Sequence, residues 1–219
     1  MSLSAKVYLF VLLAFVLGYA LGRRQQRPSK QQGASFQNQG ESQVTRAIRA
    51  EFAAPDHHLL NHITLRLPDG TTQIDHILVS RFGVLVIETK DYKGWIFADS
   101  QRPTWTQVFP NGKFQFQNPI FQNMRHLQAV RSLLDFLPPE TITSAVVFTG
   151  DAEFKTDMPA GVFTLSGLLA HLRSFTEERL SMNRVHFCVG RLETARLALS
   201  GQTDLEHIDS LQKRFGHSA

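Results

Sequence analysis

The stretch TTQIDHILVSRFGVLVIETK, residues 71–90, contains two apolar runs separated by a short break at residues 81–83. Ile, Val and Leu dominate both runs, and the break ends in a glycine. This pattern predicts two buried strands joined by a tight turn, which is an antiparallel hairpin.

Three charged residues interrupt the apolar hairpin: Asp75, Glu88 and Lys90. A two-residue turn at Arg81 and Phe82 predicts Asp75 directly opposite Glu88, with Cβ atoms about 4.5–5.5 Å apart. Lys90 shares the face of Glu88 because strand side chains alternate. A register shifted by two residues places Asp75 opposite Lys90 and keeps all three residues on one face.

Two carboxylates and an ammonium are costly to bury without compensation. A divalent cation supplies that compensation, and oxygen ligands of this kind suit Mg²⁺ or Mn²⁺. The hairpin therefore predicts a metal site at Asp75 and Glu88. The alternatives are a satisfied ion pair with a spare carboxylate and an exposed sheet edge.

Further residues in order along the chain carry a resemblance to a known family. Residues 37–150 resemble a nuclease-related (NERD) domain, a branch of the restriction-endonuclease-like PD-(D/E)xK superfamily. The matching landmarks are Gly40-Glu41, Ile74-Asp75-His76, Glu88-Thr89-Lys90, Lys93-Gly94, Trp105, Asn118-Pro119 and Gln122-Asn123. Ile74 stands where the superfamily has proline, and His126 stands where some relatives carry tyrosine four residues after Gln122.

The resemblance implies an α/β fold, a restriction-endonuclease-like mixed sheet flanked by helices. It also implies metal-dependent hydrolysis of phosphodiester bonds in nucleic acid, with DNA as the expected substrate. The catalytic edge would consist of Glu41, Asp75, Glu88 and Lys90. Asp75, Glu88 and the Ile87 carbonyl would hold Mg²⁺ or Mn²⁺, and Gln122 is a weaker candidate for positioning. The competing interpretation is a catalytically silent module of the same fold that binds nucleic acid or protein at the membrane.

The N-terminal residues 1–22 predict a membrane anchor. Val7 to Gly22 is uncharged and apolar, with Lys6 before it and Arg23-Arg24 after it. As a helix this segment spans about 24 Å, and snorkelling of the flanking cations extends it towards the hydrocarbon thickness of about 30 Å. The positive charge after the segment predicts a single pass with a cytoplasmic domain. The alternative is a cleaved signal peptide, followed by secretion or a periplasmic location.

The charge is distributed unevenly along the chain. The formal net charge is +4, but residues 1–32 contain five Lys and Arg and no acid. The remaining residues carry 18 basic and 19 acidic side chains, a net charge of −1. The basic residues 23–36 therefore form a juxtamembrane linker rich in Gln and Ser. The folded part lacks the general basic footprint of a strong nucleic-acid binder.

The rest of the chain predicts a continuous α/β domain, with residues 151–219 as a C-terminal extension packed on the same domain. Helices are expected over 40–52, over 119–136 after an Asn118 cap, from a Ser166 cap to about 180, and in two segments ending near 215. Strands are expected over 62–67, within 95–116 around a hairpin turn at Pro110-Asn111-Gly112, and over 141–149, 161–165 and 184–189. The single cysteine, Cys188, is expected in the core, which excludes a disulfide framework.

Two other groups of residues receive structural interpretations. His57, His58 and His62 match no compact ligand pattern and are expected in a solvated loop with a histidine at a strand entry. Phe109, Phe114, Phe116 and Phe121 are expected to pack a sheet, with base stacking as the alternative. His76 is expected on the face opposite Asp75, either in the core or behind the residues of the site, and not as a catalytic residue.

Overall fold

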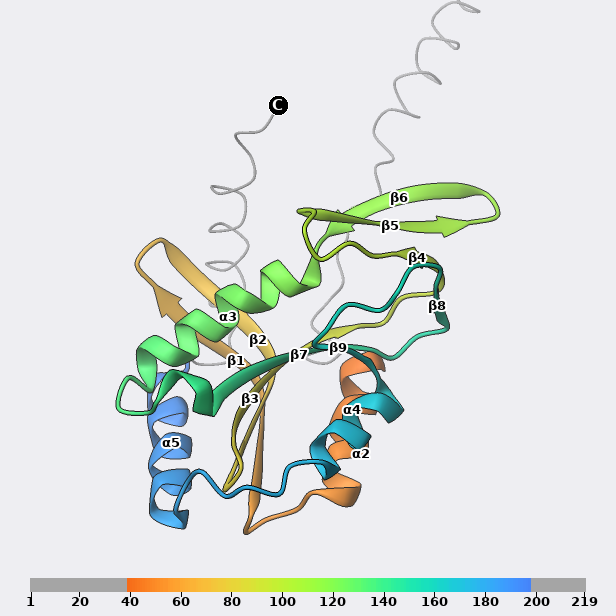
Figure 1. The fold of residues 1–219 in the computed structure, drawn as a ribbon. Coiled ribbons are helices and arrows are strands. Elements are labelled where there is room, and N and C mark those ends of the chain that lie inside the picture. The colour runs from red at the N-terminus through yellow and green to blue at the C-terminus, as the bar shows by residue number, and fades with distance from the viewer. Residues whose placement is uncertain (1–38, 198–219) are drawn as a thin grey trace, which may run out of the picture. The chain divides into compact units, whose positions relative to one another are not determined.

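A five-stranded mixed sheet, ordered β1-β2-β3-β7-β9, organises the residues that the computed structural model describes, 39–197 (Figure 1). A second sheet has four strands in the order β6-β5-β4-β8. The strands are β1 His57–Leu67, β2 Gly70–Ser80, β3 Gly83–Lys90, β4 Gly94–Phe97, β5 Thr104–Phe109, β6 Gly112–Gln117, β7 Ile142–Phe148, β8 Ala152–Phe154 and β9 Val162–Thr164. The helices are α2 Gln39–Glu51, α3 Pro119–Leu133, α4 Leu165–Arg173 and α5 Met182–Ala195, with a 3₁₀ turn at Pro139–Thr141.

Strand β3 is the middle strand of the first sheet. It pairs antiparallel with β2 in the predicted register, beginning at Ser80 opposite Gly83, and parallel with β7 on its other side. Every residue of β3 except Lys90 is buried. A strand covered on both faces has a nearly continuous apolar sequence, which explains the composition of the hairpin.

Helices cover both faces of this sheet and form two apolar layers. Helices α2 and α4 lie side by side on one face, where Val44 and Ile48 of α2 pack on Leu85 and Ile87 (Figure 1). Helices α3 and α5 contribute Val130 and a second set of apolar side chains to the other layer. The predicted mixed sheet flanked by helices is confirmed.

The second sheet has its own core around Trp105, which is 1% exposed. Trp105 stacks with Phe148 of the first sheet and contacts Phe116 and Phe154 edge-on, so the two sheets share this layer. Residues Pro110 and Asn111 form the predicted turn between β5 and β6, since Phe109 pairs with Gly112.

Helix α3 begins as predicted. The Asn118 side chain caps it by accepting a hydrogen bond from Ile120 N at 2.9 Å, and Pro119 occupies the first helical position. The helix ends at Leu133, three residues before the expected end.

Three sequence predictions about the other elements are wrong. The first of them concerns residues 184–189, which lie in helix α5 instead of a strand. Val185, Cys188 and Leu192 are buried at helical spacing, and Ser181 caps the helix. The apolar run at 185–189 resembles a strand in sequence, but packing of one stripe against the sheet selects the helix.

The other two errors concern boundaries. Helix α4 is capped by Thr164, whose hydroxyl accepts from Gly167 N, and not by Ser166; it ends at Arg173, seven residues before the expected end at about 180. Strand β1 begins at His57, so the three histidines lie within a strand and not in a loop. The β1–β2 pairing extends from Leu67 opposite Gly70 to His57 opposite Ser80, and it draws these polar residues into the sheet.

The predicted anchor 7–22, the linker 23–36 and the last predicted helix near 215 lie outside the described residues. Within residues 39–197, no helix has the length and apolar character needed to cross a membrane.

Candidate active site

The ladder between β2 and β3 stops where the charged residues begin. Its last pair is His76 opposite Ile87. At the next position Asp75 Oδ2 accepts the main-chain hydrogen bond of Thr89 N at 2.7 Å. The carboxylate of Asp75 therefore takes the place of a main-chain acceptor, and Glu88 lies close enough to influence its pKa.

A local distortion accompanies this end of the ladder. On the other side of β2, pairing with β1 is present on either side of His62 and Asp75 but absent between them. His62 has a φ of 51°, a left-handed conformation that is uncommon for a residue with a side chain. Ile74 and Ile77 belong to the same apolar layer although strict alternation would place them on opposite faces. The regular alternation of side chains along β2 is therefore interrupted at Asp75.

Asp75 is a partly buried carboxylate close to two other acids. Thr89 N donates a hydrogen bond of 2.7 Å to its Oδ2. Burial, then the neighbouring carboxylates of Glu88 and Glu41, raise the pKa of Asp75 well above its usual value, and the Thr89 amide and Lys90 only partly oppose them.

Glu88 is buried, with 2% exposure, but both of its oxygens have partners. Lys90 Nζ lies 2.7 Å from Oε1, and His126 Nε2 lies 3.1 Å from Oε2. Burial by itself would raise the pKa of Glu88, but Lys90 and His126 outweigh it and lower that pKa. Glu88 is therefore ionised at neutral pH.

Lys90 lies between Glu88 and Gln122. Its ammonium donates to Glu88 Oε1 at 2.7 Å and to Gln122 Oε1 at 3.0 Å. Burial lowers the pKa of Lys90, but the opposite charge and hydrogen bond of Glu88 prevail and raise it. The structure thus brings Gln122 of α3, the weakest of the predicted site residues, into contact with the ammonium.

Glu41 approaches from the first turn of α2, as predicted. It is 9% exposed, close enough to influence the pKa of Asp75, and lies 3.4 Å from His62 Nδ1. Burial, followed by the charge of Arg196, lowers the pKa of His62, so this histidine is neutral at neutral pH. His62 therefore leaves the negative charge of Glu41 largely in place.

The predicted metal ligands are limited to Asp75, Glu88 and the Ile87 carbonyl. Ile87 is fully buried between β2 and β7. Within residues 39–197, no three His, Cys, Asp or Glu side chains are grouped so as to hold a metal ion. The chain therefore offers a pair of carboxylates, and not a closed ligand cage, for a cation.

Sequence reasoning missed His126, which is 4% exposed and contacts Glu88 directly. The signal was its position four residues after Gln122, because side chains four apart lie on one face of a helix. Although histidine replaces tyrosine at this position, its side chain reaches the site.

Three histidines of β1 and β2 have their contacts with residues outside the proposed catalytic set. His76 is fully buried, with Nδ1 2.8 Å from Asn61 Oδ1, and burial lowers its pKa to about 3, which agrees with the predicted core position. His57 contacts Phe52 and Phe82, and His58 contacts His186.

The aromatic residues divide between core and surface. Phe116 packs on Tyr92 and Trp105, and Phe109 packs on Phe114, as expected for sheet packing. Phe114 and Phe121 remain 57% and 39% exposed.

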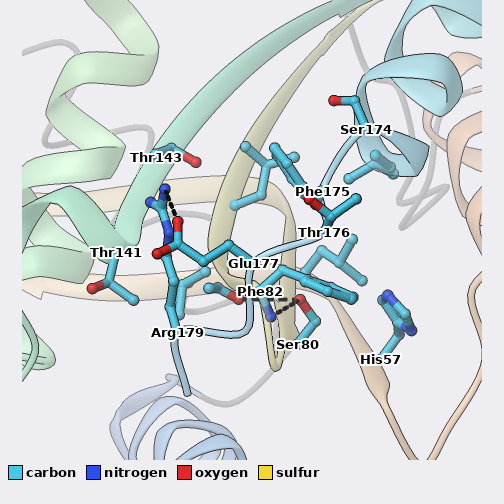
Figure 2. A pocket seen from close by; sticks show the side chains of 15 residues that line it. His57, Ser80, Phe82, Thr141, Thr143, Ser174, Phe175, Thr176, Glu177 and Arg179 are labelled. Atoms are coloured by element: carbon cyan, nitrogen blue, oxygen red, sulfur yellow. Dashed lines mark hydrogen bonds and ion pairs between the residues drawn. The ribbon is translucent and has the colours of Figure 1, made fainter.

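Two hollows lie at opposite ends of β3. One of about 230 Å³ surrounds the β2–β3 turn and is lined by Ser80, Phe82 and Arg179 (Figure 2). It lies five residues from the Asp75–Glu88 level, a distance of about 17 Å along a strand. The other, of about 470 Å³, is lined by Phe148 and Thr149, beside Lys90 at the charged end of β3.

Comparison with known proteins identifies relatives of this chain. Residues 37–149 match the family described as nuclease-related domain. An uncharacterized protein of Bacillus anthracis is 38% identical over 181 residues, which cover 80% of this chain and 84% of that protein. No solved structure matches the chain.

Proposed function

The chain belongs to the nuclease-related domain family, and we propose that it is a metal-dependent nuclease that hydrolyses phosphodiester bonds, with DNA as substrate. Asp75, Glu88, Lys90 and Glu41 form the proposed active site. The observation that carries this proposal is the partly buried carboxylate of Asp75, which accepts from Thr89 N at the end of the hairpin ladder and lies close to two further carboxylates, those of Glu88 and Glu41. A fold that needed only an ion pair would require Glu88 and Lys90 but not Asp75.

The donor set fits a hard divalent cation. Asp75 and Glu88, with the Ile87 carbonyl as an additional ligand, would hold Mg²⁺ or Mn²⁺. Mg²⁺ usually keeps several waters and binds through one or two carboxylates together with substrate phosphates, so a pair of carboxylates is sufficient. Such an ion lowers the pKa of a bound water and stabilises charge on the phosphate.

Lys90 and Gln122 support the reacting groups from the protein side. The Lys90 ammonium is held by two acceptors, so its position is defined before substrate arrives. A cation held in place neutralises charge that develops on a phosphate without further reorganisation. Gln122 keeps Lys90 from pairing with Glu88 alone, and Glu41 adds negative charge on the side of Asp75.

The proposal includes binding of the substrate beside β3 and attachment to a membrane. The hollow lined by Phe148 and Thr149 would take part of the nucleic-acid strand, because Phe148 is the strand neighbour of Lys90. Residues 7–22 would anchor the protein in a single pass, with the basic linker against anionic lipid and the domain in the cytoplasm. Resistance of the chain to alkaline extraction from membranes tests the anchor.

One observation favours a second function, that of a catalytically silent interaction module at the membrane. Both oxygens of Glu88 already have partners in Lys90 and His126, as in a structural ion pair. The net charge of −1 after residue 32 also gives the domain little general attraction for nucleic acid. Loss of cleavage in point variants distinguishes the two functions.

The test is cleavage of DNA and RNA by the purified full-length chain, with Mg²⁺, with Mn²⁺ and with a chelator. We expect metal-dependent cleavage of DNA that Asp75→Asn and Glu88→Gln abolish. Asp157→Asn, at an exposed aspartate, is the matched control and should retain full activity. Cleavage that persists in Glu88→Gln, or in the chelator, would reject the assignment.

A further inference from the structure

His126 lies in the core with hydrogen-bonding partners on both ring nitrogens. Its Nδ1 is 2.7 Å from Thr72 Oγ1, and its Nε2 is 3.1 Å from Glu88 Oε2. Thr72, Glu88 and His126 are 3%, 2% and 4% exposed. The three side chains come from β2, β3 and α3, so they connect three elements through one buried row.

The partners define how the ring is protonated in its neutral form. The carboxylate of Glu88 only accepts hydrogen bonds, so Nε2 carries the hydrogen and donates it. Nδ1 is then an acceptor, and the Thr72 hydroxyl donates to it. The resulting direction, from Thr72 through His126 to Glu88, satisfies every group in the row.

The row holds one side of Glu88 while Lys90 holds the other. Helix α3 presents Gln122 and His126 one turn apart, and these contact Lys90 and Glu88 respectively. Each oxygen of Glu88 thus has one fixed donor, which restricts the carboxylate to a single orientation. Each oxygen also keeps a second lone pair that can face a cation.

We infer that His126, oriented by Thr72, is a positioning residue that fixes the Glu88 carboxylate for metal binding. This inference rests on the proposed function of the site. Partners that orient a ligating carboxylate typically change metal affinity or activity by about 10–100-fold when removed. The competing explanation is that the three residues only pack the core. In that case apolar side chains of similar shape could replace them at little cost in stability, and metal affinity would not change.

The test compares variants of the full-length chain that differ in which contact they keep. His126→Leu removes both hydrogen bonds, Thr72→Val removes only the orienting hydroxyl, and His126→Gln keeps a donor that reaches Glu88. His171→Leu, at a helix histidine that packs between Phe163 and Phe175, is the matched control. The measurements are Mn²⁺ affinity by calorimetry, melting temperature in chelator, and kcat and KM for DNA.

We expect His126→Leu to weaken Mn²⁺ binding about tenfold or more and to lower kcat, with KM for DNA unchanged. His126→Gln should restore most of both losses, Thr72→Val should show a smaller loss of the same kind, and His171→Leu should match the wild type. If His126→Leu does not fold, Thr72→Val reports on the same row.

Wild-type Mn²⁺ affinity in His126→Leu and Thr72→Val, whatever their melting temperatures, would overturn the inference. Equal losses of Mn²⁺ affinity in His126→Leu and His126→Gln would also overturn it, because the loss would then come from the missing imidazole ring and not from the missing hydrogen bond to Glu88. If the wild-type chain binds no Mn²⁺ and cleaves no DNA, the proposed function fails first and the inference fails with it. Binding by the wild type that is insensitive to His126 rejects the inference alone.

Discussion

Replacing Asp75 with asparagine should stabilise the metal-free protein while it abolishes metal binding. The asparagine side chain keeps a carbonyl oxygen that accepts the Thr89 hydrogen bond, but it removes the charge that faces Glu88 and Glu41. Two full charges about 5 Å apart repel by about 3 kcal/mol at an effective dielectric constant of about 20. Lys90 offsets much of that repulsion, so we expect a gain in unfolding free energy of about 1 kcal/mol.

The effect should depend on pH in a defined direction. The pKa of Asp75 is raised in the folded state, so the folded protein favours the protonated form. Below about pH 4, the pKa of Asp75 in the unfolded chain, the charge of Asp75 costs the wild type no stability relative to the variant. As the pH rises through the pKa of Asp75 in the folded protein, the unfolding free energy of the wild type falls relative to that of the variant. Above that value the difference should be constant.

Thermal melts in chelator between pH 4 and pH 8 measure this difference. A gain of about 1 kcal/mol corresponds to a rise of about 2–4 °C for a domain of this size. Asp157→Asn is the control, and its melting temperature should follow the wild type at every pH. A lower melting temperature for Asp75→Asn than for the wild type at pH 8 would show that the Asp75 carboxylate stabilises the metal-free protein, which would refute the reasoning. A difference that does not change with pH would refute it as well, because ionisation of Asp75 would then not be the cause.

Three further substitutions test the partners of this site. Glu88→Gln leaves the ammonium of Lys90 buried without its anion, and breaking such a pair costs about 3–5 kcal/mol, so the melting temperature in chelator should fall; an unchanged melt would contradict the pairing seen here. Lys90→Met should abolish cleavage but leave Mn²⁺ affinity by calorimetry equal or higher, because it removes a cation from the site; weaker Mn²⁺ binding would argue against this role. Asn123→Leu removes two hydrogen bonds to main-chain carbonyls of β3 and β7 and should lower stability by about 1–3 kcal/mol per orphaned carbonyl in denaturant titrations. The same variant should leave KM for DNA unchanged, and a large change in KM would place Asn123 in the site itself.

The hairpin and its charged residues were predictable from the sequence because the evidence for them is local. A two-residue turn fixes the register, and strand alternation then fixes which side chains share a face. The same local logic located the Asn118 cap and the turn at residues 110–111. It also predicted Asp75 and Glu88 as neighbours, but it treated them as two equivalent metal ligands.

Tertiary structure decided how the charges are compensated. Helix α3 brings His126 and Gln122 to the hairpin from more than thirty residues away, so Glu88 and Lys90 have partners while Asp75 lies between two acids. The helix at residues 182–195 was likewise decided by the apolar face that the sheet presents, and not by the β propensity of its own residues. The sequence by itself determined which residues carry charge in the central hairpin. Which of those charges is satisfied depended on side chains distant in sequence, because electrostatic compensation acts through space and not along the chain.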